Sequence, residues 1–152
     1  MASAEAKMYA NYIIDKLERI VSCLDGLSSE QINAKPPVPE TNSLLVLAVH
    51  TMANVNEATF QGLLGQEVNR DRDSEFAASG SSAEDVRNQW ETLKGQVRPA
   101  LEGLTDEQLN RTLVHPRRGE MTGRELLLFT VTHASEHVGH AELTRDWIVS
   151  QG

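Results

Sequence analysis

Apolar residues recur at helical spacing in two stretches of the chain, and charged or polar residues fill the positions between them. In the first stretch the apolar positions are Ile13, Leu17, Ile20, Leu24 and Leu27. In the second stretch they are Val86, Trp90, Leu93, Val97 and Leu101. A stripe with this period gathers the apolar side chains on one side of a helix and leaves the other side to solvent. Both stretches are therefore predicted to be amphipathic helices.

Another helix, the second in chain order, is predicted after a stretch that cannot be helical. Pro36–Pro39 cannot continue a helix, because proline lacks the N–H group and clashes with the preceding turn. Thr41–Ser43 then offers side chains that can cap a new helix. The apolar run that starts at Leu44 continues to Leu64–Gly65, where glycine is typical of a helix end.

Capping boxes mark two helix starts. Ser81 with Glu84 precedes the second amphipathic stripe, and Thr122 with Glu125 precedes a stretch without helix breakers. In such a box the hydroxyl and the side chain three residues later each satisfy a backbone N–H group at the helix start. The last stretch is therefore predicted to form one long helix that ends at about Val149.

The remaining segments are connections and a repeat. Residues 66–81 and 113–121 contain many helix breakers and no hydrophobic period, so we expect a long irregular connection and a loop. Leu24–Asn33 aligns without gaps with Leu101–Asn110, either because both are helix stop-and-restart signals or because a helical hairpin is duplicated. Both interpretations predict an all-α fold, a four-helix bundle of two helical hairpins joined by the long connection, as a single domain over residues 1–152.

Length, charge and cysteine count narrow the class of protein. The 152 residues suit one domain, and 22 acidic against 14 basic residues give a formal charge of −8. That sign disfavours nucleic acid and anionic membrane surfaces as partners. Cys23 is the only cysteine, and the chain has neither a leader-like start nor an apolar stretch of membrane length. We therefore expect a cytoplasmic protein with no membrane or nucleic-acid partner.

Histidines occupy positions where a bundle core would have apolar residues. His133, His137 and His140 share one face of the last helix, and His50 lies in the middle of the apolar run of the second helix. Burying an imidazole without a partner costs on the order of 1–3 kcal/mol. A metal ion satisfies several imidazoles at once, and three of them leave a fourth position open for water or substrate. The pattern favours a divalent metal site, although a single His-x-x-x-His pair also occurs in ordinary packing.

Other polar residues are candidates for the surroundings of such a metal. Asn54 and Glu57 share the face of the second helix that carries its histidine, and either could hold a ligand histidine or contact substrate. Arg117 and Arg118, in the second loop, are candidate substrate contacts or a solvated basic pair. Arg145, near the end of the last helix, could receive a substrate carboxylate or stabilise the C-terminus of that helix.

The sequence also contains the letters of a hydrolase motif. His133-Ala-Ser-Glu136-His137 matches H-x-x-E-H, in which the glutamate activates water. Enzymes with this motif need a further ligand well downstream, and little chain follows His137. Hydrolysis through Glu136 is therefore a remote alternative. A di-iron site of the ferritin type would need Glu-x-x-His motifs, and the chain contains none.

The histidine motifs resemble those of the DinB-like superfamily of four-helix bundles. In that family a capped apolar run leads to a central histidine, as Asn42–His50 does here. The last helix of the family carries His-x-x-x-His with a glycine two residues on, as His133, His137 and Gly139 do. The resemblance implies that His50, His133 and His137 hold the metal and that the protein forms dimers. It also implies kinship with thiol-dependent transferases and with mycothiol-dependent maleylpyruvate isomerase.

This resemblance leads to an expected function and to an alternative. We expect a divalent metal, zinc or nickel, that binds a low-molecular-weight thiol as thiolate, and the thiolate then attacks a small electrophile. The alternative is a non-catalytic, metal-stabilised bundle that acts as a binding or stress-response module. Many family members have glutamine where this chain has His140. The fourth coordination position of the metal discriminates between the two functions. An open position indicates an enzyme, whereas closure by His140 indicates a structural site.

The second helix also predicts self-association. It is apolar over much of its circumference, because Val46, Leu47, Val49 and Met52 point in several directions. One bundle core needs fewer apolar faces, and a large exposed apolar face is typical of an interface. A homodimer is therefore predicted.

Overall fold

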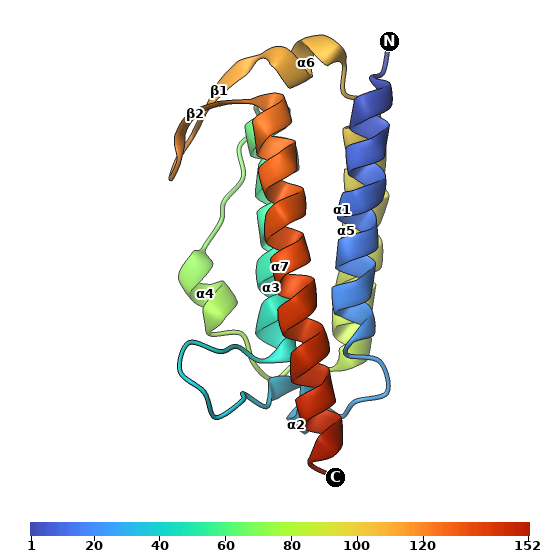
Figure 1. Ribbon diagram of the computed structural model, residues 1–152, viewed down its shortest axis with the longest axis vertical. Coiled ribbons are helices and arrows are strands. Elements are labelled where there is room, and N and C mark those ends of the chain that lie inside the picture. Colours follow the sequence, from blue (N-terminus) through green and yellow to red (C-terminus); the bar gives the residue numbers. More distant parts are fainter.

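Four long helices form the body of the molecule in the computed structural model, which describes residues 1–152 (Figure 1). They are α1 (Ala4–Ser22), α3 (Leu44–Asn56), α5 (Ala83–Glu102) and α7 (Gly123–Ser150). A π-helical segment, η1 (Glu57–Leu63), continues α3. Short helices lie in the connections, namely α2 (Ser29–Asn33), α4 (Arg72–Phe76) and α6 (Asp106–Asn110). An antiparallel hairpin consists of β1 (Thr112–His115) and β2 (Gly119–Thr122). The predicted four-helix bundle is confirmed.

The two predicted hairpins are interleaved rather than set side by side. α1 packs against both α5 and α7, and α3 packs against the same two helices. In Figure 1, α1 and α7 run downward, whereas α3 and α5 run upward. The principal neighbours of each helix therefore come from the other hairpin. The long connection permits this arrangement because it carries the chain from the upper end of η1 back to the lower end of α5 (Figure 1).

Side-chain caps determine where the helices begin. Thr122 and Glu125 form the predicted capping box of α7, with hydrogen bonds of 3.1 and 2.7 Å. The box of α5 consists of Ser82 and Asp85, one residue later than predicted, because paired serines and paired acids offer two equivalent registers. α2 and α6 lie in the repeated segments, and both begin with capping boxes of the same kind. The repeat thus corresponds to a shared helix restart.

Two segments that are predicted to be irregular contain regular structure. α4 lies within residues 66–81, and the Asp71 carboxylate caps it by accepting a 3.2 Å hydrogen bond from the backbone N–H of Ser74. Residues 113–121 fall within the β1–β2 hairpin, where Gly119 follows the turn with a φ of 78°. Elements of four or five residues are too short to show a hydrophobic period, so the pattern does not reveal them.

Almost the whole circumference of α3 is buried inside one chain. Val46, Leu47 and Met52 are each no more than 6% exposed, and Val49 is half-buried. All the other long helices and two short ones, α2 and α4, contact α3. Its apolar faces are therefore covered without a second copy, and they give no support for a homodimer. Dimerisation remains a prediction from the family resemblance.

Two glycines allow α7 to lie close to its neighbours. A Cβ atom on Gly123 would collide with the backbone oxygen of Gln108 in α6. A Cβ atom on Gly62 would collide with the side chain of Leu126. These close approaches set the height of α7 relative to η1 and hence relative to α3.

The outer faces of the long helices mix polar and apolar side chains. Tyr12 on α1 and Leu128 and Leu143 on α7 are exposed, while the ion pair of Arg19 with Glu142 links the same two helices. None of the helices combines the length and the apolar character that crossing a membrane requires.

Candidate metal centre

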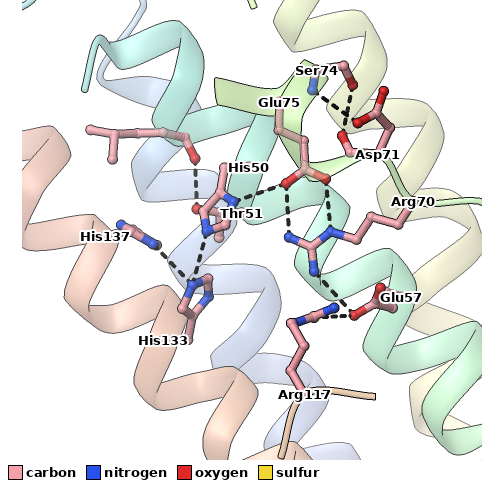
Figure 2. A network of polar contacts seen from close by, with 11 residues as sticks. His50, Thr51, Glu57, Arg70, Asp71, Ser74, Glu75, Arg117, His133 and His137 are labelled. Carbon is pink, nitrogen blue, oxygen red and sulfur yellow. Dashed lines mark hydrogen bonds and ion pairs between the residues drawn. The ribbon is translucent and has the colours of Figure 1, made fainter. Parts of the chain in front are cut away.

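Three histidine rings from two helices point toward one another inside the bundle (Figure 2). Nε2 of His133 lies 3.2 Å from Nε2 of His50 and 3.1 Å from Nε2 of His137. One ligand atom from each ring lies within 4.8 Å of the other two. The structure thus brings together the three histidines predicted from the sequence, and they form a cluster that could hold a metal ion.

Helix geometry explains why these rings meet. His133 and His137 are one turn apart on α7 and project from the same face. α3 packs against α7 in the opposite direction and presents His50 to this face. His50 is only 5% exposed, whereas the two rings of α7 are half-buried. The cluster therefore lies at the boundary between the core and the surface.

A carboxylate sets the orientation of His50. Oε1 of Glu75 lies 3.0 Å from Nδ1 of His50. Because the ionised carboxylate can only accept, Nδ1 carries the hydrogen, and Nε2 of the neutral ring keeps a lone pair. Burial lowers the pKa of His50, although the contact with Glu75 opposes this shift. The ring is therefore neutral, and its Nε2 atom is free to bind a metal ion.

Burial keeps the other two rings neutral as well. It lowers the pKa of His133 to about 3 and that of His137 to about 4, and the neighbouring histidines add to both shifts. Nδ1 of His133 is buried without a hydrogen-bond partner. Each contact between two nitrogens needs one donor, so these rings cannot all be satisfied by one another. A cation at the point where they converge would satisfy the facing lone pairs.

Two of the three nitrogen pairs have the spacing that such an ion requires. Zinc–nitrogen distances of about 2.0–2.1 Å at tetrahedral angles place ligand nitrogens roughly 3.3 Å apart. The two Nε2 contacts of the cluster are close to this spacing. No carboxylate or cysteine completes the cluster. Three neutral imidazoles suit divalent zinc, nickel, copper or iron.

A chain of ion pairs, buried except at Arg117, extends from His50 to the turn of the β-hairpin (Figure 2). Arg70 binds the Glu75 carboxylate through Nε at 2.8 Å and through Nη2 at 2.9 Å. Its Nη1 atom lies 3.2 Å from Oε1 of Glu57, which also accepts a 2.6 Å hydrogen bond from Arg117. The chain therefore connects α4, η1 and the hairpin turn to the histidine of α3.

Both carboxylates in this chain are ionised. Burial alone would raise the pKa of Glu75, but hydrogen bonds with Arg70 and His50 outweigh it and lower that pKa. Burial would likewise raise the pKa of Glu57, but its contacts with Arg117 and Arg70 lower it. A carboxylate with a lowered pKa is a weak proton acceptor at neutral pH, so neither group suits the role of general base.

Glu75, not Glu57, holds a clustered histidine. The sequence places Glu57 on the helix face of His50, where it could hold a histidine or contact substrate, and in the structure the Glu57 side chain binds arginines. Glu75 lies in the connection that shows no hydrophobic period. The Asp71 cap is a signal for a short helix there. Only tertiary packing, however, brings that helix and Arg70 against α3.

Two candidate residues lie outside the cluster. His140 is exposed, and its Nδ1 atom lies 3.3 Å from Nδ1 of His137, whose Nε2 faces the cluster. His140 therefore contacts a clustered histidine and does not close the fourth position. Arg145 donates to the backbone oxygens of Cys23 and Asp25, beyond the C-terminal end of α1. Of the two roles that the sequence leaves open for Arg145, these contacts favour a helix end over a substrate carboxylate, although the end is that of α1 and not that of its own helix.

Other candidates gather around a cavity of about 430 Å³ beside the cluster. Asn54, Arg117 and Arg118 line this cavity together with two of the clustered histidines. His115, a residue that the sequence gives no reason to include, lines it as well and is 7% exposed. A histidine at the end of a strand of four residues carries no periodic signal of burial.

A second cavity, of about 660 Å³, borders the cluster at His137. Its lining includes His140 and the apolar side chains of residues 36–38, Leu143 and Trp147. The two cavities share no lining residue. The cluster therefore lies between a cavity rich in arginine and a largely apolar one.

Glu136, the residue on which hydrolysis through the H-x-x-E-H letters would depend, is exposed on α7. It does not belong to the histidine cluster. It follows His133 by three residues and directly precedes His137, and its side chain is turned to solvent. The motif is therefore present in the sequence without its geometry.

Fold and cluster together define a four-helix bundle with a three-histidine candidate metal site. A profile of the DinB superfamily matches residues 14–141, and the chain belongs to the DinB superfamily. No curated protein matches the sequence.

Two solved structures have a similar fold. A conserved protein from Enterococcus faecalis superposes with a TM-score of 0.78 at 16% identity, over 99% of each chain. YfiT from Bacillus subtilis superposes with a TM-score of 0.72 at 18% identity, over 95% of this chain and 88% of its own. YfiT is described as a probable metal-dependent hydrolase with an unusual four-helix bundle topology. At such identities the similarity establishes the fold.

Replacing any one clustered histidine should abolish stoichiometric metal binding. His50→Ala, His133→Ala and His137→Ala each remove one of three nitrogens, and two imidazoles alone make a much weaker site. Elemental analysis of protein purified without an affinity tag measures the metal content. His115→Ala and His140→Ala should retain the metal, since neither side chain belongs to the cluster. Full metal content in any of the first three variants contradicts the assignment.

Glu75→Gln should weaken metal binding by roughly 10–100-fold, the usual effect of losing a partner that orients a ligand histidine. Glu57→Gln is the matched control, because Glu57 is equally buried and also binds Arg70 but touches no histidine. Both variants should lose stability, since each removes one of the two negative charges that compensate the buried positive charge of Arg70. Competition with a chromogenic chelator measures the affinity, and equal weakening in both variants would contradict an orienting role for Glu75.

The metal-free protein should lose stability as pH falls from about 6.5 toward 4.5. An unfolded chain binds protons on histidine near pH 6.5, whereas folded His133 and His137 stay neutral until about pH 3 and 4. Each such histidine contributes a slope of about 1.4 kcal/mol per pH unit in this window. Urea unfolding at several pH values measures it. His133→Gln should show a shallower slope, and an unchanged slope would contradict burial of a neutral His133.

Proposed function

We propose that the protein joins a low-molecular-weight thiol to a small electrophile in a reaction that depends on a divalent metal ion. One observation supports this most directly, namely that the histidine cluster lies between two cavities with no lining residue in common. A transferase must hold two reactants in contact at the reacting atoms. A cluster with an open position between two cavities offers that arrangement.

The surrounding carboxylates favour a thiol over water as the nucleophile. Metal-dependent hydrolysis often uses a glutamate as general base. Glu57 and Glu75 are bound to arginines, and Glu136 is exposed away from the cluster. A thiol needs no such base, because a bound divalent ion deprotonates a coordinated thiol.

The reaction is a substitution at the electrophilic atom. The thiol loses its proton to solvent, and the sulfur forms a bond to an electrophilic carbon. With a halogenated aromatic, the same carbon releases halide, so the products are a thioether, a proton and a halide ion. The chain holds the two reactants on either side of His133 and His137, and burial keeps both imidazoles neutral at working pH.

Metal-dependent hydrolysis is the second candidate function. YfiT is described as a probable metal-dependent hydrolase, and a site of three imidazoles with an open position also suits water. A non-catalytic, metal-stabilised bundle has less support. A structural ion is normally closed in by four protein ligands, and the cluster offers three.

The test uses cobalt-substituted protein and a panel of small thiols. Binding of a thiol at the metal should produce a sulfur-to-cobalt charge-transfer band. A free thiol with a pKa near 8.5 is only a few per cent thiolate at neutral pH, so ionisation alone should accelerate attack on a halogenated aromatic roughly tenfold. Positioning of the electrophile should add to this factor.

Two variants serve as the negative and the positive control of this measurement. His137→Ala should lose both the band and the acceleration, whereas Glu136→Gln should retain both because Glu136 lies outside the cluster. A panel in which no thiol alters the cobalt spectrum would refute the proposal. Product formation at the same rate without thiol would establish hydrolysis in its place.

A further inference from the structure

The cavity that borders the cluster at His50 and His133 is cationic, in contrast to the chain as a whole, whose formal charge is −8. Four arginines line it, Arg70, Arg72, Arg117 and Arg118. No carboxylate lines it. Only Glu57 and Glu75 pair with these guanidinium groups, so four positive charges face two negative ones. An excess of two positive charges therefore remains at the cavity.

The excess comes from Arg72 and Arg118. Neither forms an ion pair with a carboxylate of the chain, whereas Arg70 and Arg117 both do. Cζ of Arg118 lies 3.4 Å from the centre of the Phe129 ring. This stacking supports the guanidinium plane from one side and leaves the N–H groups at its edge free. Such groups bind carboxylate or phosphate through paired hydrogen bonds.

Asn54 also lacks a partner at this cavity. It is 7% exposed, and its buried Oδ1 atom has no hydrogen-bond partner. The NH2 group of Asn54 is not among the buried unpartnered atoms and forms no hydrogen bond within the chain. It is therefore available to donate to a ligand in the cavity that Asn54 lines.

His115 adds a further donor. Its Nδ1 atom accepts a 3.1 Å hydrogen bond from the backbone N–H of Arg117. Burial, with the charge of Arg117, lowers the pKa of His115, so the ring is neutral and its hydrogen lies on Nε2. The cavity thus combines several hydrogen-bond donors with an excess of positive charge, and no acidic group lines it.

We propose that this cavity binds an oxyanion, a carboxylate or phosphate group, carried by one of the two reactants. The inference rests on the proposed function, because it names the chemical class of a substrate of the same centre. A bound oxyanion neutralises the charge of Arg72 and Arg118 and accepts from Asn54. The largely apolar cavity at His137 has no comparable charge, so the two reactants differ in character.

Calorimetric titration of the full-length protein tests this inference with three probes. Succinate presents carboxylates, methyl phosphate presents a phosphate, and succinamide is an uncharged analogue of succinate. The protein is used with its metal and again after chelation, because an anion could also bind the metal itself. We expect at least one anion to bind in both preparations and succinamide to bind at least tenfold more weakly. The tighter of the two anions identifies the group that the cavity prefers.

Variants locate the binding. Arg72→Gln and Arg118→Gln should each weaken anion binding roughly tenfold, as expected for loss of a charge-assisted hydrogen bond. Both arginines are exposed and have no carboxylate partner, so these variants should fold normally. Asn54→Asp should abolish binding, because it places a negative charge at the cavity. Lys7→Gln, the same change of charge on an exposed residue of α1 outside the cavity, should alter affinity less than twofold.

Three results would overturn the inference. They are binding of succinamide as tight as that of the anions, equal weakening by Lys7→Gln and Arg118→Gln, and no binding of either anion. Because the titration contains no thiol and no turnover, it is independent of the transferase assay. Anion binding without thiol transfer leaves the oxyanion site standing and refutes the transferase. Thiol transfer without anion binding supports the transferase and refutes the oxyanion site.

Discussion

The contact of His50 on α3 with the histidine pair of α7 is the constraint on which the candidate site depends. It requires the two helices to pack side by side, and the interleaved order of the bundle provides this. Burial at this contact keeps the rings neutral, with a pKa of about 3 for His133 and about 4 for His137. Three neutral imidazoles whose nitrogens converge cannot all be satisfied by one another, and a divalent ion would satisfy their facing lone pairs.

The buried ion pairs of Arg70 extend this constraint to segments far from the helix contact. Arg70 lies between Glu75, which holds His50, and Glu57, which holds Arg117 in the hairpin turn. Removal of one member of such a chain leaves a buried charge uncompensated, which is costly. The orientation of His50 and the walls of the neighbouring cavity are therefore coupled. A shift of α4 or of the hairpin would disturb both together.

Local charge and net charge lead to different conclusions about ligands. The net charge of −8 disfavours polyanionic partners at long range. At the cavity, however, Arg72 from α4 and Arg118 from the hairpin turn add two charges that no carboxylate of the chain offsets. A cavity of about 430 Å³ admits a small anion but no polymer. The two features together favour a small anionic reactant beside a metal centre.

The sequence by itself determined the four long helices and the three histidines. Apolar spacing and capping residues are local properties, and the spacing of His133 and His137 places both on one helix face whatever surrounds them. Tertiary structure alone decided the interleaved order of the helices and the roles of Glu75 and Arg72. These residues lie in a connection whose only helix has five residues, too few to show a period. Their positions depend on contacts between segments distant in sequence, and such contacts leave no local pattern.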